Sequence, residues 1–168
     1  MKISFFNLRV SSSYFLFLLI ALCGCATGDI RAMKGLNESI FQSSSSYREP
    51  SFGTQWLVSL VNYQGKDKIE MINMLNRNRV PLPGLNRADS QPISVSVSSN
   101  GDRLAFIRQR EDKTELLIYR RRLGTLQQIE LSPRGIPRRV SLDSSGRVLA
   151  VQVSREGRWD VEVIRLNN

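Results

Sequence analysis

The sequence predicts an all-β fold for residues 51–168 of this 168-residue chain, on three observations. Ile93, Val95 and Val97 alternate with serines, which is the period-two pattern of a half-buried strand. Residues 104–107 and 116–119 are uninterrupted apolar runs, as expected for strands that are covered on both faces. Residues suited to tight turns separate the runs, among them Asn100-Gly101, Leu123-Gly124 and Ser145-Gly146.

The N-terminal segment predicts export. Lys2 and Arg9 precede an apolar run of about ten residues, and small residues follow it, as in a secretory signal. The run is too short to span a bilayer comfortably. Its end, Leu22-Cys23-Gly24-Cys25, resembles the lipobox of bacterial lipoproteins. That resemblance implies a lipid on Cys25, a bacterial membrane anchor in the cell envelope and a periplasmic domain. An ordinary cleaved signal and an uncleaved anchor are the alternatives.

Three segments follow from these patterns. Residues 1–24 form the lipoprotein signal peptide, and residues 25–50 form the lipidated cysteine and a Ser-rich tether that contains four consecutive serines at 43–46. Residues 51–168 form the β domain. Apolar residues between 30 and 41 would also suit a short helix, but Gly35 and the small length make such a helix marginal.

The charge predicts anionic partners. The chain has 24 basic and 15 acidic residues, and two of the basic ones precede residue 25, so the exported chain carries +7. Such an excess attracts anionic lipid, an acidic cell-wall polymer or an acidic protein face. Export makes nucleic acid an unsuitable partner.

The missing residue types argue against catalysis. The sequence contains no histidine, and Cys25 would be the one cysteine of the exported chain. Serine–histidine and cysteine–histidine nucleophiles are therefore excluded, and so is the commonest zinc ligand. We expect no enzyme activity, no metal site and no cofactor. Asp160 and Glu162 share one face of a predicted strand, where solvation is the expected role.

An internal repeat sets the architecture. Residues 92–121 match residues 137–166 at a constant offset of 45, with ten identities in thirty positions. A fainter copy at an offset of 47 places residues 57–60 over 104–107 and residues 69–72 over 116–119. Residues 69–72 would also suit a short helix. A period of 40–45 residues with four short strands is the spacing of a β-propeller blade.

The segment Ser98–Phe106 resembles the blade motif of TolB-type propellers, and Asp143–Val151 resembles it more weakly. Ser99 and Ser144 stand where the motif has proline. The resemblance implies an incomplete β-propeller of about two and a half to three four-stranded blades. It also implies a non-catalytic scaffold of the cell envelope that binds a protein partner. An electrostatic binder of lipid or polymer is one alternative, and a fragment related to propeller-containing hydrolases is another.

Closed propellers have about four to eight blades, so the predicted blades leave open edges. A homodimer in which two chains complete a six-bladed ring is one prediction. An open stack whose edges are protected by charge and by Pro81, Pro83 and Pro133 is the alternative.

Arginines supply the candidate binding site. Arginine favours planar contacts with carboxylates and phosphates. An anion-binding or partner-binding rim is therefore predicted, and a solvated surface is the alternative. Trp56 and Trp159 are expected in the core. The rim residues are Arg120, Arg121, Arg122, Arg134, Arg138 and Arg139.

Overall fold

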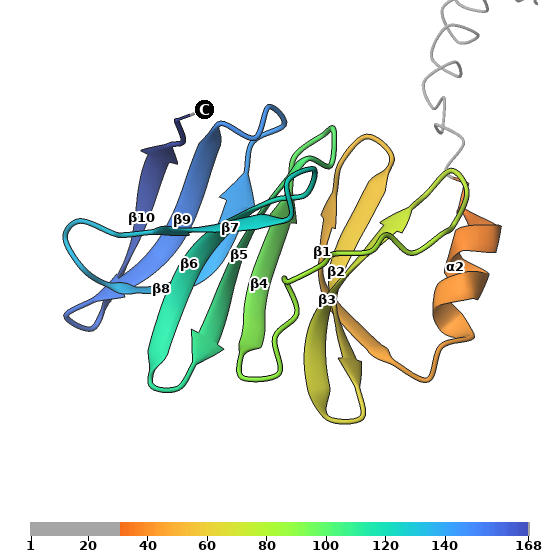
Figure 1. Ribbon diagram of the computed structural model, residues 1–168, viewed down its shortest axis with the longest axis horizontal. Helices are drawn as coiled ribbons and strands as arrows, with labels where there is room; N and C mark the ends of the chain where they lie inside the picture. Colours follow the sequence, from red (N-terminus) through yellow and green to blue (C-terminus); the bar gives the residue numbers. More distant parts are fainter. Residues whose placement is uncertain (1–30, 168) are drawn as a thin grey trace, which may run out of the picture. The chain divides into compact units, whose positions relative to one another are not determined.

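The computed structural model describes residues 31–167, so the predicted signal peptide and Cys25 lie outside the described residues. The chain divides into two units, Met1–Lys34 and Gly35–Asn168, and the second contains every strand of the described residues (Figure 1). The helix α2 (Lys34–Phe41) precedes these strands. The strands are β1 (Ser46–Phe52), β2 (Trp56–Tyr63), β3 (Lys66–Asn73), β4 (Gln91–Val97), β5 (Arg103–Arg110), β6 (Lys113–Arg120), β7 (Thr125–Ile129), β8 (Ile136–Leu142), β9 (Val148–Arg155) and β10 (Arg158–Arg165).

The strands form three antiparallel sheets, and the all-β prediction is confirmed. Blade 1 consists of β1, β2 and β3, and a single bridge from Ile72 to Arg79 marks the position of a fourth strand. Blade 2 has the full order β4-β5-β6-β7, and blade 3 consists of β8, β9 and β10. The described chain is therefore an incomplete β-propeller of three blades.

The repeat predicts the strand positions correctly. The limits of β9 and β10 follow those of β5 and β6 by 45 residues, and those of β2 and β3 precede them by 47. The fainter third copy is thus a true blade. The helical alternative for residues 69–72 is wrong, because β3 pairs with β2 along its whole length.

The blades stack through their first strands. β4 contacts both β1 and β8, and Figure 1 shows the three sheets in sequence order. One core lies between blades 1 and 2 and includes Leu60, Met71 and Phe106. A second core lies between blades 2 and 3 and includes Ile107 and Val151. Blade 2 is therefore covered on both faces, as its continuous apolar runs predict.

Serine hydroxyls connect the first strands at the repeat interval. Ser51 Oγ accepts a hydrogen bond from Val97 N at 3.1 Å, and Ser96 Oγ accepts one from Leu142 N at 2.9 Å. Both the acceptors and the donors are 45 residues apart. Each bond satisfies a backbone N–H that has no partner in its own sheet on that side. The small serine side chain allows the strands to approach this closely.

The N-terminal part of the domain differs from the prediction. β1 begins at Ser46, five residues before the domain boundary predicted at residue 51, and α2 lies inside the predicted tether. Leu36 of α2 is buried, and the Arg77 guanidinium packs so closely on Gly35 that a Cβ there would lie 2.5 Å from Cζ. An eight-residue helix is marginal alone, so we attribute its presence to these contacts. No helix in residues 31–167 is long and apolar enough to cross a membrane.

The last strand alternates between apolar and polar residues as predicted, but its polar residues lie on the covered side and its apolar residues on the exposed side. Trp159, Val161 and Val163 are exposed, whereas Asp160 and Glu162 are half-buried. Glu162 forms an ion pair with Arg155, which explains why a carboxylate is tolerated on the inner side. The predicted core position of Trp159 is therefore wrong, whereas that of Trp56 is confirmed.

The serine contacts generate a stability prediction. Ser96→Ala should lower the free energy of unfolding by about 1–3 kcal/mol, because the buried N–H of Leu142 loses its acceptor. The matched control is Ser141→Ala. Ser141 is the repeat equivalent of Ser96 but is exposed, so its replacement should change stability by less than about 0.5 kcal/mol. Urea unfolding followed by circular dichroism measures both. Equal losses would contradict this account of the blade contact.

Candidate functional site

The six arginines of the predicted rim do not lie together. Arg120 is the last residue of β6 and pairs with Thr125, and Arg121 and Arg122 follow it. Arg134 lines an open cavity with Lys113 and Thr114, at the opposite end of β6. An eight-residue strand separates those ends by about 23 Å. Arg138 and Arg139 are exposed on β8, the first strand of blade 3.

Arg121 has a structural position. Its Nε donates to the Gly101 carbonyl oxygen at 2.7 Å, and its guanidinium carbon lies 4.9 Å from the centre of the Trp56 ring. The side chain therefore connects the β4–β5 turn of blade 2 to the start of β2 in blade 1. Arg122 is 77% exposed, and its Nε donates to Asp102 Oδ1 at 2.8 Å. Asp102 thus neutralises part of the charge that the sequence assigns to the rim.

Arg139 belongs to a shallow groove over the first strands of the three blades. Glu49 accepts a hydrogen bond from Ser94 Oγ at 3.2 Å, and its other oxygen lies 3.5 Å from Arg139 Nη2. The repeat interval of 45 residues separates Glu49 from Ser94 and Ser94 from Arg139. These three polar residues therefore occupy equivalent positions on the first strands of the three blades. The groove encloses about 380 Å³. The single carboxylate among its lining residues, that of Glu49, already contacts Ser94 and Arg139.

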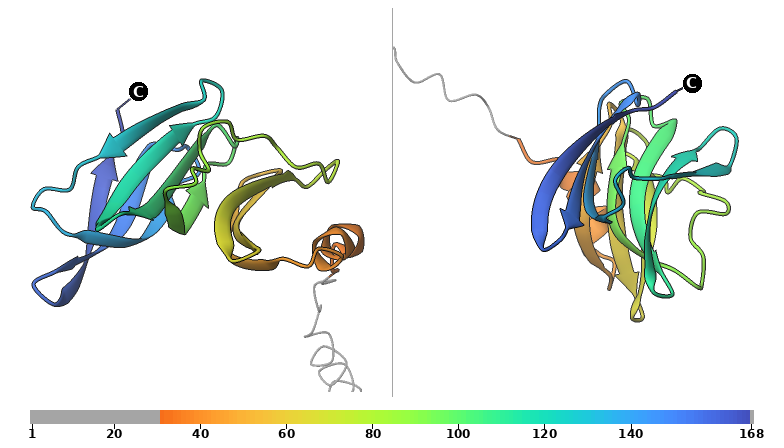
Figure 2. Two further views of the ribbon diagram at one scale, coloured as in Figure 1. Left: turned by 60° about the horizontal axis from the view of Figure 1, so that its bottom comes forward. Right: turned by 90° about the vertical axis from the view of Figure 1, so that its left-hand side faces the viewer.

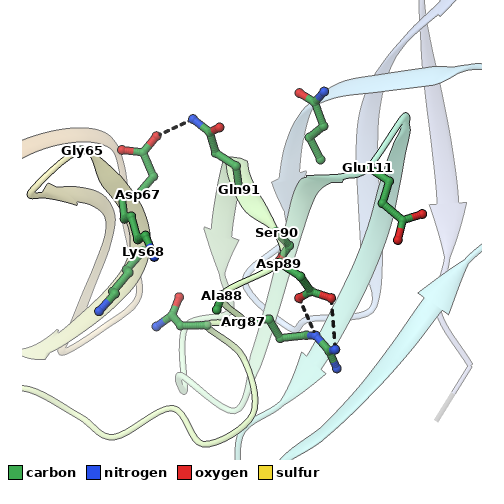
Figure 3. Close-up of a pocket in the computed structure, with 12 residues that line it drawn as sticks. Gly65, Asp67, Lys68, Arg87, Ala88, Asp89, Ser90, Gln91 and Glu111 are labelled. Atoms are coloured by element: carbon green, nitrogen blue, oxygen red, sulfur yellow. Dashed lines mark hydrogen bonds and ion pairs between the residues drawn. The ribbon is translucent and has the colours of Figure 1, made fainter.

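A larger cavity lies where blades 1 and 2 meet, at the end of the sheets that holds the β2–β3 and β5–β6 turns (Figure 3). We call it the inter-blade cavity; it has a volume of about 500 Å³ and is open to solvent. Its walls are polar and carry both signs of charge. The lining residues are Gly65, Lys66, Asp67, Lys68, Asn86, Arg87, Ala88, Asp89, Ser90, Gln91, Gln109 and Glu111.

Asp67 organises one wall. It accepts hydrogen bonds from Asn62 Nδ2 at 2.8 Å and from Gln91 Nε2 at 3.1 Å, and it forms an ion pair with Arg48. Burial alone would raise the pKa of Asp67, but these hydrogen bonds hold it below its ordinary value. The Gln91 bond crosses from blade 2 to blade 1, as Figure 3 shows.

Asp89 organises the other wall. Arg87 Nε donates to Asp89 Oδ1 at 2.9 Å, and Arg87 Nη2 donates to Oδ2 at 3.2 Å. Arg110 Nε lies 3.1 Å from the same Oδ2 atom. The hydrogen bonds from Arg87 lower the pKa of Asp89 to about 2. Both aspartates of the cavity are therefore ionised and paired at neutral pH.

This arrangement suits recognition of a polar surface. A catalytic carboxyl group usually has a raised pKa in an apolar pocket. Here the hydrogen-bond partners of Asp67 and Asp89 lower the pKa of both aspartates. Within residues 31–167, no group of three or more His, Cys, Asp or Glu side chains is placed to hold a metal ion. The cavity instead offers lysine donors, amide groups, the Glu111 carboxylate and the remaining acceptor sites of the two aspartates.

Sequence reasoning missed this cavity. Asp67, Asp89 and Gln91 come from β3, a connection and β4, and no spacing motif links them. The available signal was the superposition of the repeats, which brings the β2–β3 and β5–β6 turns to one end. The residues of these turns, Gly65-Lys66-Asp67 and Glu111-Asp112-Lys113, indicate turns but no common site.

Comparisons with known proteins agree on the fold. No protein-family model matches the chain, and no curated protein matches it. Two solved structures are similar at a TM-score of 0.55. TolB from Acinetobacter baumannii is 16% identical over 70% of this chain. The β-propeller domain of the trilobed protease from Pyrococcus furiosus, described as having an open velcro topology, is 14% identical over 72%.

The chain spans only part of each of these structures, 29% of the first and 39% of the second. At this level of identity, the likeness shows the β-propeller fold alone. It agrees with the three-blade arrangement and with the resemblance carried by the Ser98–Phe106 motif.

A comparison of neighbouring arginines tests which of them is structural. Arg121→Ala should lower the free energy of unfolding by about 1–3 kcal/mol, because a charged hydrogen bond and a cation–π contact are lost. Arg122→Ala should change it by at most about 1 kcal/mol, because an exposed ion pair contributes little. Urea unfolding of the two variants checks the difference. A larger loss for Arg122→Ala would contradict it.

The pKa of Asp89 provides a second test. Its folded pKa of about 2 lies below the unfolded value of about 3.9, so its stabilising contribution is complete above pH 4 and is lost as the pH falls through 2. Arg87→Gln should raise this pKa towards the unfolded value, whereas Arg79→Gln, which removes the partner of Glu70, should not. Carboxyl NMR titration measures the shift. An unchanged pKa in Arg87→Gln would refute the assignment.

Proposed function

We propose that this protein is a non-catalytic binding module of the bacterial cell envelope, held at a membrane by a lipid on Cys25, whose partner is a protein. The inter-blade cavity is the proposed contact site. The observation that carries this proposal is that the cavity presents polar groups of both signs on a rigid frame. Its two aspartates are fixed by Arg48, Arg87 and Arg110.

A protein surface is the partner that fits this chemistry. The inter-blade cavity has lysines beside ionised carboxylates, so neither sign of charge dominates its walls. A protein surface also presents donors, acceptors and both charges, and complementary pairs across an interface give specificity. The likeness to TolB supports the fold of such a module, and its role is a proposal for this chain.

The electrostatic alternative is favoured by a different observation. The exported chain carries a net charge of +7, and Arg122, Arg134 and Arg138 are exposed. An anionic lipid or polymer could be held by this charge without a shaped site. Such binding weakens strongly with salt, because exposed charges are screened over about 10 Å at 0.1 M ionic strength.

Relation to propeller-containing hydrolases is the third reading. One structure with a similar fold is a domain of a protease. A panel of esterase, peptidase and glycosidase substrates tests this reading, and turnover by the purified chain would replace the binding proposal with it.

Site-specific photo-crosslinking tests the contact site. A photo-reactive amino acid at Ala88, which is exposed in the inter-blade cavity, should give one discrete protein adduct in intact cells. The same group at Thr125, exposed at the other end of blade 2, should not give it. Lys68→Glu in the same cavity should reduce the Ala88 adduct at least about fivefold through charge reversal. An adduct of equal yield from both positions, or from neither, would overturn the proposed site.

Retention on anionic vesicles that is lost at 0.5 M salt and insensitive to Lys68→Glu would favour the electrostatic alternative.

The anchor has its own test. In a bacterial host, the wild-type chain should incorporate labelled palmitate and sediment with membranes, and Cys25→Ala should do neither. Cys23→Ala is the matched control and should retain both properties, because the lipobox resemblance assigns the lipid to Cys25 alone. Unchanged labelling of Cys25→Ala would exclude this anchor.

A further inference from the structure

Within residues 31–167, no element covers one largely apolar face of blade 3. Val163 lies opposite Ala150, which in turn lies opposite Ser141, so the three side chains share one side of the sheet. Trp159 and Ile136 both lie opposite Ser154 on that same side. Val161 lies between Trp159 and Val163. We call this surface the open face; its defining residues are Ile136, Ser141, Ala150, Trp159, Val161 and Val163.

The bulge in β8 contributes to this surface. The register between β8 and β9 shifts between Pro137 and Arg139, so Arg138 has no partner on β9. In a regular strand, residues five positions apart point to opposite faces. The bulge shifts this alternation by one residue, so Ile136 lies on the same side as Ser141. Ile136 is also exposed. Among the described strands, β10 alone carries more than one exposed large hydrophobic side chain.

The same face is an interface in the other two blades. Val161 and Val163, 72% and 67% exposed, correspond to Leu116 and Ile118 of blade 2, which are 2% and 3% exposed. In blade 1 the corresponding residues are Ile69 and Met71, which are also buried. In each case the sheet of the next blade provides the cover. The repeat thus reproduces on blade 3 a surface whose two other copies bind a β-sheet.

The opposite end of the stack is covered differently. Figures 1 and 2 show α2 beside blade 1, on the side away from blade 2. Leu36 of α2 is buried, and so are Leu57 and Ile72, which belong to neither inter-blade core. A six-bladed ring of two chains would have to join blade 3 of each chain to blade 1 of the other. The helix occupies the side of blade 1 where that contact would form.

We propose that two copies of this chain associate through their open faces, with the blade 3 sheets packed against each other about a twofold axis. A β-sheet is the covering element in both internal interfaces, and a second copy provides an apolar sheet that is uncovered. A twofold contact is self-complementary and closes at two copies. The open face has no acidic side chain, and Gln152, which lies opposite Val161, adds an uncharged amide on its middle strand. Arg139 at its β8 edge has a partner in Glu49. This association does not use the inter-blade cavity.

Sedimentation equilibrium of the full chain in a mild non-ionic detergent tests the dimer. A reversible monomer–dimer equilibrium is expected between about 1 and 200 µM, the range of dissociation constants for small interfaces. Val163→Lys should raise the dissociation constant at least about tenfold, because it places a charge in the apolar contact. Leu123→Lys is the matched control, since Leu123 is also 67% exposed but lies in the β6–β7 turn. It should change the constant by less than about twofold.

Three outcomes would overturn the dimer: a wild-type monomer across the whole range, a dimer insensitive to Val163→Lys, or equal weakening by both variants. Binding of the open face to anionic lipid vesicles in place of dimerisation would assign it to a membrane surface instead. Circular dichroism of each variant confirms that the fold is retained. A second substitution, Val161→Thr, keeps the strand preference and should weaken the dimer in the same direction. The Ala88 crosslink is independent of all these results, so failure of the dimer and failure of the proposed contact site are separable.

Discussion

Blades 1 and 2 of this protein each depend on the next blade to cover one of their two faces. The contact has two parts that recur with the repeat: an apolar face, and serine hydroxyls on the first strand that accept backbone N–H groups of the neighbouring first strand. Apolar burial supplies most of the stabilisation, whereas the hydroxyls prevent buried N–H groups from losing their hydrogen bonds. The inter-blade cavity takes its position from this stack, since its lining residues come from two sheets.

The dependence on neighbours explains what the sequence predicts well. A repeat without gaps preserves strand length, register and turn position together, so the two clear copies place β4–β6 and β8–β10 correctly. It also identifies β2 and β3, although local periodicity alone leaves a helix open for residues 69–72 of β3. The first strand of blade 1 was missed because Glu49 and Pro50 interrupt its pattern, and β1 has a register shift at this point. The short α2 was discounted because its stability comes from contacts with residues such as Arg77, about 40 positions away.

The same dependence explains what the sequence does not predict. Alternation along β10 separates Trp159 from Asp160, but only the position of blade 2 decides which of them faces inward. The arginines were grouped by their nearness in sequence, whereas β6 and β8 carry them to different places. Their partners, Asp102 and Glu49, come from blade 2 and blade 1. A prediction of the cavity would have required the distances between turns of different blades, which single-chain patterns do not contain.

The described stack has two unlike ends, and this asymmetry limits how it can be completed. At blade 1, α2 lies beside the sheet on the side away from blade 2, where a preceding blade would stack, and Leu36 of this helix is buried. At blade 3 the repeat continues its pattern without cover, and Ser141 remains exposed where Ser51 and Ser96 each accept a backbone N–H. Covering the open face would therefore bury apolar surface and would also give Ser141 a possible donor. An uncovered sheet face with this composition is costly in water and prone to association. Pairing of two such faces removes both from solvent and leaves the inter-blade cavity of each copy accessible, so that one chain can associate with itself and bind another protein at the same time.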